Sequence, residues 1–282
     1  MKVDDIMGRD HITVELPANR NEILQLMVTR DVGAVYVVAK DMELKGIVTR
    51  RDILRNPDKE QIALIMERDP VRVSAGSDVK EAAELMYRHG IHNLPVIDED
   101  NKLVGVLRTI NFLRIIEEGN YKETVESTLR GKCVPVYEET PLSIIREIME
   151  ISDSYALCVL GVNGKLTGVI SEADLFKHIR VDESVARIDI GLGEDEDKWT
   201  WEGMRDIVGL YYVNAMLALP PIAVKESMVK DIITVSPKTS VSQAARKMRV
   251  SNIEHIPVVG VDGSLLGMVE DIDLLKVLVD GS

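Results

Sequence analysis

The chain has 282 residues, and its 47 Asp and Glu outnumber its 34 Lys and Arg, so the net charge is −13 at pH 7. This charge opposes binding to nucleic-acid phosphates and to anionic membrane surfaces, so we expect neither as a partner. With 45% hydrophobic and 29% charged residues, the composition is that of a globular protein.

Membrane spans, secretion signals and metal sites are also disfavoured. The longest apolar run, 215–224, contains two prolines and is far shorter than the roughly 20 residues of a bilayer span. Acidic residues stand close to the N-terminus (MKVDDIMGRD), where a secretory signal would have an apolar segment. Cys133 and Cys158 are too few for a disulfide framework or a zinc site. We therefore expect a cytoplasmic protein without a metal.

One pattern recurs four times along the chain. A glycine followed by apolar residues marks each copy, and successive glycines are 59, 63 and 99 residues apart: Gly46, Gly105, Gly168 and Gly267. Without any gap, the same offsets superpose a methionine (Met27, Met86, Met149 and Met248) and an apolar strand position (Ile12, Val71, Val134 and Ile233). Agreement at several positions over about 45 residues indicates internal repeats.

The second copy gives the order of elements within a repeat. An alternating segment at 71–73 predicts a short strand, and apolar residues at 82, 83 and 86 have helical spacing. An apolar strand over 94–97, a polar turn at 99–101, a strand ending at 107 and a helix from about 111 follow. The unit is therefore β-α-β-β-α, and the fold class is α+β.

A unit of about 60 residues is marginally stable alone, so the sheets of neighbouring repeats should pack together. We expect repeat one at 1–62 and repeat two at 63–125, which form a first module, 1–125. Repeat three at 126–180 and repeat four at 225–282 belong to a second module, 126–282.

The wider spacing before the fourth repeat reveals an insertion at 181–224. It contains an acidic run, Gly193 to Asp197, and both tryptophans. Apolar residues with i, i+3, i+4 spacing then predict a helix: Met204, Ile207, Val208, Tyr211, Tyr212, Ala215 and Met216. The segment has no evident nucleophile, base or set of metal ligands, so an enzyme within it is disfavoured.

A short motif follows the marker glycine in two repeats. Repeat one has Gly46 followed by Thr49-Arg50-Arg51-Asp52, and repeat three has Gly168 followed by Ser171-Glu172-Ala173-Asp174, which gives G-h-h-[ST]-x-x-D. A hydroxyl at a helix start can hold phosphate, and an Asp presents two acceptors to a ribose diol. The same residues also form a capping box, which needs no ligand. Both interpretations stay open at this point.

The four β-α-β-β-α units, the strands Pro95–Asp98 and Pro257–Val259, and this motif resemble the CBS domain family. In that family two units pair as a Bateman module, and four-unit members include the gamma subunit of AMP-activated protein kinase and its archaeal relatives. The resemblance covers the chain except 181–224. It implies a disc-like, pseudo-symmetric assembly that binds AMP, ADP, ATP or S-adenosylmethionine in clefts between paired units.

The resemblance also implies roles for individual residues. Asp52 and Asp174 would hold the ribose, and Thr49 and Ser171 would face phosphate. Repeat four keeps the acid as Asp273, but Glu270 replaces the hydroxyl and would repel a phosphate. Repeat two has lost both groups and offers Arg108 and Asn111 instead, which predicts an empty or weak pocket whose Arg108 offers its charge across the pair interface.

Basic residues near the motifs complete the predicted site. His92 and His255 precede the Pro95 and Pro257 strands, where the resembled family has phosphate-contacting basic residues; a structural role for either histidine stays open. Arg50 and Arg51 in repeat one, against Glu172 in repeat three, predict that repeat one prefers the more anionic nucleotide.

The predicted function is a non-enzymatic sensor that binds an adenine nucleotide, without a cofactor, and passes its occupancy to an unknown regulated protein or to a homodimer. An S-adenosylmethionine-type sensor and an assembly scaffold with vestigial pockets are the alternatives.

Overall fold

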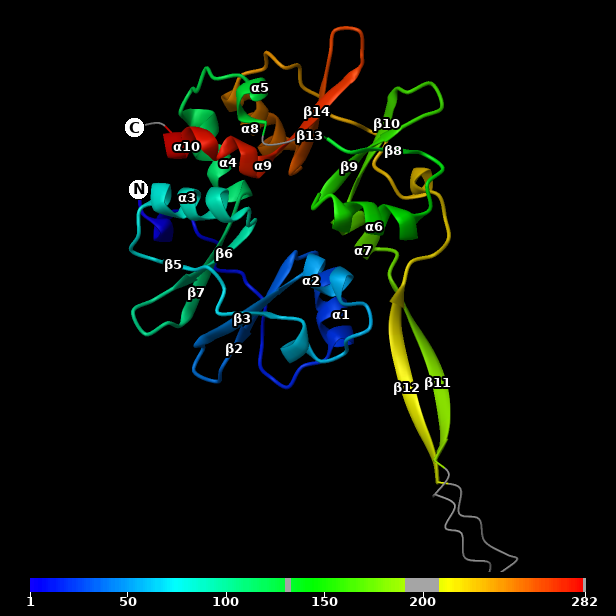
Figure 1. Ribbon diagram of the computed structural model, residues 1–282. Coiled ribbons are helices and arrows are strands. Elements are labelled where there is room, and N and C mark those ends of the chain that lie inside the picture. Colours follow the sequence, from blue (N-terminus) through cyan, green and yellow to red (C-terminus); the bar gives the residue numbers. More distant parts are fainter. Residues whose placement is uncertain (130–132, 191–207, 281–282) are drawn as a thin grey trace, which may run out of the picture.

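The computed structural model describes residues 1–129, 133–190 and 208–280. Within these ranges the chain folds into four β-α-β-β-α units, as predicted, and the units surround a common centre (Figure 1). This arrangement agrees with the predicted disc.

Repeat one contains β1 (Thr13–Val14), α1 (Arg20–Arg30), β2 (Ala34–Val38), β3 (Leu44–Thr49) and α2 (Arg50–Arg55). The strand β1 runs parallel to β2, and β2 is antiparallel to β3. A short fourth strand, β4 (Glu67–Arg68), comes from the start of repeat two and pairs with β3. Short 3-10 turns lie at Val3–Asp5 and Ile62–Leu64.

Repeat two has the same order with β5 (Val73–Ser74), α3 (Val79–His89), β6 (Asn93–Ile97), β7 (Leu103–Arg108) and α4 (Ile110–Glu118). Repeat three contains β8 (Pro135–Tyr137), α6 (Leu142–Ile151), β9 (Ala156–Leu160), β10 (Leu166–Ser171) and α7 (Glu172–Phe176). The one-turn helix α5 (Val125–Thr128) precedes it.

Repeat four contains α8 (Val241–Ser251), β13 (His255–Val259), β14 (Leu265–Glu270), α9 (Asp271–Leu274) and α10 (Lys276–Asp280). Its first strand is reduced to one parallel bridge between Val235 and Val258. A 3-10 turn at Val224–Glu226 leads into the repeat.

The insertion forms a hairpin, where we predicted a helix over 204–216. Strand β11 (Arg180–Ile190) pairs antiparallel with β12 (Val208–Ala218), from Arg180 opposite Ala218 to Ile190 opposite Val208, and the hairpin projects from the body (Figure 1). The helix prediction is wrong for 208–216, because β-branched and aromatic residues there favour a strand and override a chance helical spacing. Residues 204–207, the acidic run and both tryptophans lie outside the described residues.

Apolar contacts join the repeats in two ways. Sheet faces meet within each module: Tyr36 and Ile47 of repeat one pack with Leu103 and Val106 of repeat two, and Cys158 of repeat three meets Met268 of repeat four. Helices connect the modules, since one continuous core includes Phe112 and Ile116 of repeat two together with residues from α8 and α9 of repeat four. The two modules are therefore joined by a shared core, which the predicted division of the chain at residue 125 did not include.

Candidate functional site

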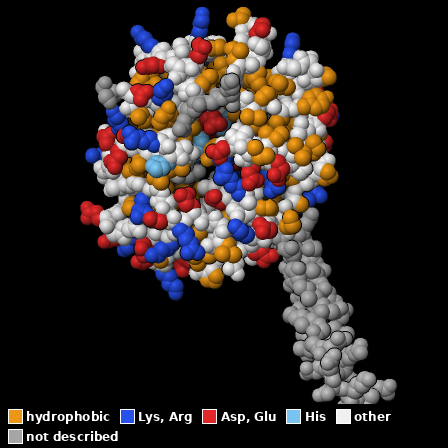
Figure 2. Space-filling view, viewed as in Figure 1, with side chains coloured by type: hydrophobic (Ala, Val, Ile, Leu, Met, Phe, Trp, Pro, Cys, Tyr) orange, Lys and Arg blue, Asp and Glu red, His pale blue; other side chains and the backbone are white. Residues whose placement is uncertain are grey.

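A cavity of about 620 Å³ lies at the centre of the molecule, and all four repeats line it. Charged side chains of both signs surround the centre of the face in Figure 2. Every site residue proposed from the sequence except Asp273 lines the cavity: Thr49, Arg50, Arg51, Asp52, His92, Arg108, Ser171, Asp174 and His255. The side chain of Asp273 is instead buried, in α9.

The last residue of each four-residue motif makes the same contact in all four repeats. Its side-chain oxygen accepts a hydrogen bond from the backbone N–H three residues earlier. The donor and acceptor residues, with their distances, are Thr49 and Asp52 at 2.8 Å, Arg108 and Asn111 at 2.7 Å, Ser171 and Asp174 at 3.0 Å, and Glu270 and Asp273 at 2.9 Å. The contact stabilises the helix start, and Asn111 makes it without a charge.

In repeats one and three the hydroxyl completes a capping box. Thr49 Oγ1 accepts from the backbone N–H of Asp52 at 3.2 Å and donates to Asp52 Oδ2 at 2.6 Å. Ser171 and Asp174 repeat this geometry at 3.4 and 2.7 Å. The capping interpretation of the motif is thus realised in both repeats, and it engages one oxygen of each carboxylate.

The second oxygen of each carboxylate differs between the repeats. Asp174 Oδ1 accepts a hydrogen bond from Lys177 Nζ at 3.0 Å. In the part of the chain that the structure describes, Asp52 Oδ1 makes no hydrogen bond, and Asp52 lines the cavity. A capped Asp52 therefore still has an acceptor for a ligand hydroxyl.

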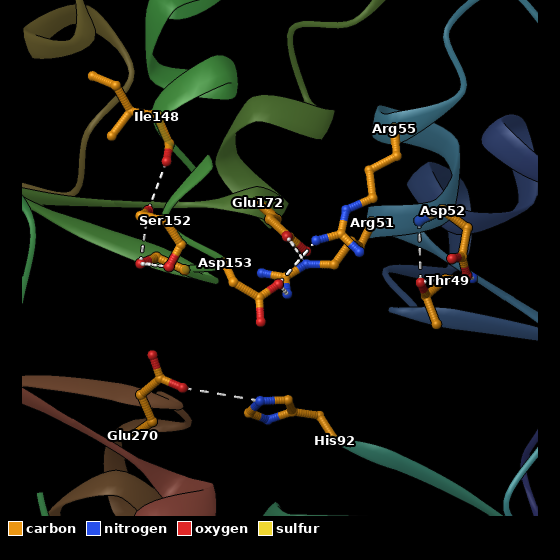
Figure 3. A network of polar contacts seen from close by, with 11 residues as sticks. Thr49, Arg51, Asp52, Arg55, His92, Ile148, Ser152, Asp153, Glu172 and Glu270 are labelled. Carbon is orange, nitrogen blue, oxygen red and sulfur yellow. Dashed lines mark hydrogen bonds and ion pairs between the residues drawn. The ribbon is translucent and has the colours of Figure 1, made fainter. Parts of the chain in front are cut away.

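Arg51 connects repeat one to repeat three (Figure 3). Its Nε donates to Glu172 Oε1 at 2.7 Å, and one terminal nitrogen donates to Asp153 Oδ1 at 2.8 Å. The guanidinium lies 3.5 Å from the ring centroid of Tyr155, a cation–π geometry. Arg55 contacts the same Asp153 oxygen at 2.9 Å.

Burial and pairing act in opposite directions on this ion pair. Burial lowers the pKa of Arg51, but Glu172, Tyr155 and Asp153 together raise it above its ordinary value. Burial raises the pKa of Glu172, and Arg51 offsets part of that increase. Because Arg51 and Glu172 neutralise each other, they no longer support the predicted preference of repeat one for the more anionic nucleotide.

Arg50 points to the other side of α2. One terminal nitrogen pairs with Asp31 Oδ1 at 3.0 Å, and the guanidinium carbon lies 5.9 Å from the centroid of the Phe176 ring. Its Nε is buried and has no hydrogen-bond partner within the described ranges. This nitrogen is a free donor at the cavity wall.

His92 of repeat two contacts repeats three and four. Its Nδ1 lies 3.3 Å from Asp271 Oδ1, its Nε2 lies 4.0 Å from Glu270 Oε2, and its ring meets the Tyr155 ring at a centroid distance of 4.4 Å. Burial lowers the pKa of His92, but Asp271, Glu270 and Glu254 together raise it above its ordinary value.

Among the described residues that line the cavity, two imidazole nitrogens are buried without a hydrogen bond: Nε2 of His92 and Nε2 of His255. Both histidines line the cavity. Buried polar atoms are normally paired, so such orphan atoms mark places where a ligand or water completes the site. Arg108 is exposed, and its side chain also reaches the cavity wall.

Sequence reasoning missed Asp153 and Tyr155, which line the cavity, and Asp271, which lies beside His92; it also missed Glu172 as the partner of Arg51. One signal was present for Tyr155, because the 63-residue offset that aligns the repeats places it at the position of His92. No comparable signal identifies Asp271, whose partners come from repeat two.

A family model of the CBS domain matches four segments of the chain, 3–59, 60–118, 125–181 and 224–280. Together with the four β-α-β-β-α units around one cavity, these matches show that the chain belongs to the CBS domain family.

Two archaeal proteins are similar to this chain over much of its length. Protein MJ1225 of Methanocaldococcus jannaschii is 28% identical over 194 residues, 62% of this chain and 69% of the relative. The crystal structure of MJ1225, proposed as an archaeal homologue of g-AMPK, has the same fold with a TM-score of 0.76 at 20% identity and covers 98% of this chain and 99% of its own. A conserved Pyrococcus horikoshii protein of solved structure has a TM-score of 0.64 at 28% identity, covering 99% of this chain and 100% of its own.

Part of this chain is also similar to a segment of an enzyme. The inosine-5'-monophosphate dehydrogenase of Methanocaldococcus jannaschii is 31% identical over 114 residues, but these are 40% of this chain and 23% of that enzyme.

Among the residues with described positions, no group of three or more His, Cys, Asp or Glu is arranged to hold a metal ion. In the same ranges no helix is long and apolar enough to cross a bilayer.

Proposed function

We propose that the protein is a non-enzymatic regulatory sensor that binds an adenosine-containing ligand, AMP, ADP or ATP, in the central cavity. The observation that carries this proposal is one cavity, lined by all four repeats, that brings the carboxylates of Asp52 and Asp174 together with the unpaired nitrogens of Arg50, His92 and His255. Its volume of about 620 Å³ lies within the range of small-molecule sites.

Two groups of residues would bind different parts of the ligand. Oδ1 of Asp52 would accept a hydrogen bond from a ribose hydroxyl, and Oδ1 of Asp174 would do so with the lone pair that Lys177 leaves free. The guanidinium of Arg50 and a protonated His92 suit the phosphate, because charge-assisted hydrogen bonds are the strongest polar contacts, and His255 adds a second imidazole at the same cavity.

Binding would act on a partner through the contacts between repeats. Arg51 joins repeat one to Glu172 and Asp153 of repeat three at the cavity wall. A ligand that fits one arrangement of these repeats better than another shifts the equilibrium by the difference between its two affinities. The regulated protein, or a second copy of the chain, would bind one of these arrangements more tightly than the other.

Calorimetric titration with AMP, ADP, ATP and S-adenosylmethionine tests the proposal. Asp52→Asn and Asp174→Asn are sharp variants, because Asn111 shows that an asparagine can make the same cap at this position. Each lost contact to a charged acceptor is worth about 1.5–3 kcal/mol, which weakens binding about 10- to 150-fold. Glu99→Gln, at an exposed hairpin turn, is the matched control and should bind as the wild type does.

A scaffold with vestigial pockets is the second candidate, because both capping boxes are complete without a ligand. A scaffold would bind none of the four compounds at millimolar concentration, and the two Asn variants would then equal the wild type. Tight binding of S-adenosylmethionine without binding of the nucleotides would instead show that the site takes a cationic adenosine compound.

A further inference from the structure

A buried carboxylate lies behind the cavity wall between repeats two and four. Asp271, the first residue of α9, is fully buried. Its Oδ2 accepts a short hydrogen bond from the hydroxyl of Thr109, a residue of repeat two that is itself buried. Its Oδ1 has no hydrogen bond within the described residues and lies 3.3 Å from Nδ1 of His92.

His92 is held between this carboxylate and the cavity. Only 12% of its side chain is exposed, and the Tyr155 ring packs against its face in an edge-to-face contact. Nδ1 lies within ion-pair distance of Asp271 Oδ1, and the opposite nitrogen, Nε2, is buried without a hydrogen bond in the described residues. His92 is one of the residues that line the cavity. The partner of one imidazole nitrogen fixes the protonation of the other.

Acidic groups face His92 from several elements. Asp271 lies on α9, Glu270 ends β14, and Glu254 precedes β13; Glu172 on α7 also interacts with its charge. Tyr155, before β9, is a neutral neighbour because burial raises its pKa to about 12. His255 on β13 is a second imidazole at the same wall. The surrounding charges thus favour a protonated His92.

We propose that Asp271 and Thr109 are positioning residues that hold His92 as a charged N–H donor toward the cavity, and that a ligand phosphate binds on this side only while His92 is protonated. This inference rests on the proposed function for the identity of the ligand. Nucleotide affinity then falls as the pH rises through the pKa of His92. Glu270, 4.0 Å from Nε2, competes with the phosphate for the same proton donor.

The test combines a histidine titration by NMR with AMP titrations between pH 5.5 and 8. Asp271→Asn keeps the size of the side chain and an acceptor for Thr109, but removes the charge behind His92. We expect the pKa of His92 to fall by at least about one unit, since a unit corresponds to a tenfold change in the protonation equilibrium. AMP affinity at pH 7 should fall several-fold, with tenfold as the limit for a shift of one unit, and at pH 5.5 by less than about threefold.

A matched control separates positioning from charge alone. Glu254→Gln removes a neighbouring charge without touching His92 Nδ1, so its pH profile should move less than that of Asp271→Asn. If Asp271→Asn does not fold, Asp271→Ser, which leaves room for water at the site, replaces it in both measurements.

Failure of the positioning role and failure of the proposed function give different results. An unchanged His92 titration in a folded Asp271 variant overturns the positioning role. Absence of AMP binding at every pH overturns the proposed function, and the NMR titration, which needs no ligand, still tests the role of Asp271 separately.

Discussion

Repeats two and four share one hydrophobic core, whereas repeats one and three have separate cores that are joined by a few apolar contacts and by ion pairs. The shared core runs from Leu94 and Phe112 of repeat two to Met248 and Leu274 of repeat four. Repeats one and three have separate cores, and Phe176 is the buried residue of repeat three that enters the core of repeat one. Arg51 and Arg55 add ion pairs between the two repeats through Glu172 and Asp153.

This difference assigns different mechanical roles to the two sides of the cavity. Close-packed apolar cores tolerate little rearrangement, so repeats two and four form a fixed frame. Ion pairs at a partly exposed interface can exchange partners with a ligand or with solvent at lower cost. The side formed by repeats one and three is therefore the one expected to respond to binding.

The largest expected effect is in the shared core. Phe112→Ala removes a fully buried ring and should lower the free energy of unfolding by about 3–5 kcal/mol, measured by urea denaturation. Hydrogen exchange should report lost protection in both α4 and α8. The equivalent change in repeat one, Ile53→Ala, should leave α8 protected, and the exposed Val162→Ala should change neither quantity. Loss of protection confined to repeat two in Phe112→Ala would contradict a shared core.

A smaller effect is expected at the charged interface. Arg51 and Glu172 are 11% and 12% exposed, so a double-mutant cycle with Arg51→Gln and Glu172→Gln should give a coupling of about 1–3 kcal/mol. Each single variant leaves one partly buried charge unpaired. The losses in free energy of unfolding of the two single variants should therefore add up to more than the loss in the double variant. Additive effects of the two substitutions would show that the pair does not hold repeats one and three together.

The smallest effect concerns Glu270. Removing its charge with Glu270→Gln takes away a repulsion of roughly 1 kcal/mol at about 5 Å from a bound phosphate, so AMP should bind about fourfold tighter at pH 6. Isothermal titration at low salt measures this change, with Glu99→Gln as the surface control. Because Glu270 also raises the pKa of His92, the titration is repeated at pH 5.5, where that effect matters least; AMP binding no tighter than in the wild type there would mean that no phosphate approaches this side of the cavity.

Local sequence patterns were enough to predict the repeats and their order of elements, because each unit carries its own periodicity and marker glycine. They failed in the insertion, where the predicted helix is a hairpin, since an apolar spacing over 208–216 fits both periods. Val208, Tyr211, Tyr212 and Val213 have strong strand propensity, and weighing it would have corrected the prediction.

The sequence predicted the motif residues of the candidate site but not the contacts between repeats. The motif residues Thr49, Asp52, Ser171 and Asp174 have local signatures, and they line the cavity as candidates. The pairing of Arg51 with Glu172, and of Asp271 with Thr109, depends on which repeats face each other across the molecule. Local sequence patterns carry no information on which repeats face each other, so these pairings could not be predicted.

Native mass spectrometry of the purified chain incubated with millimolar AMP, ADP or ATP tests the central claim most directly. We expect a bound adenosine-containing mass that is lost or sharply reduced when Asp52→Asn and Asp174→Asn are combined, while Glu99→Gln retains it. A chain that stays free of nucleotide in every mixture, or a combined variant that retains it in full, would contradict the claim that these two carboxylates hold a nucleotide in the central cavity.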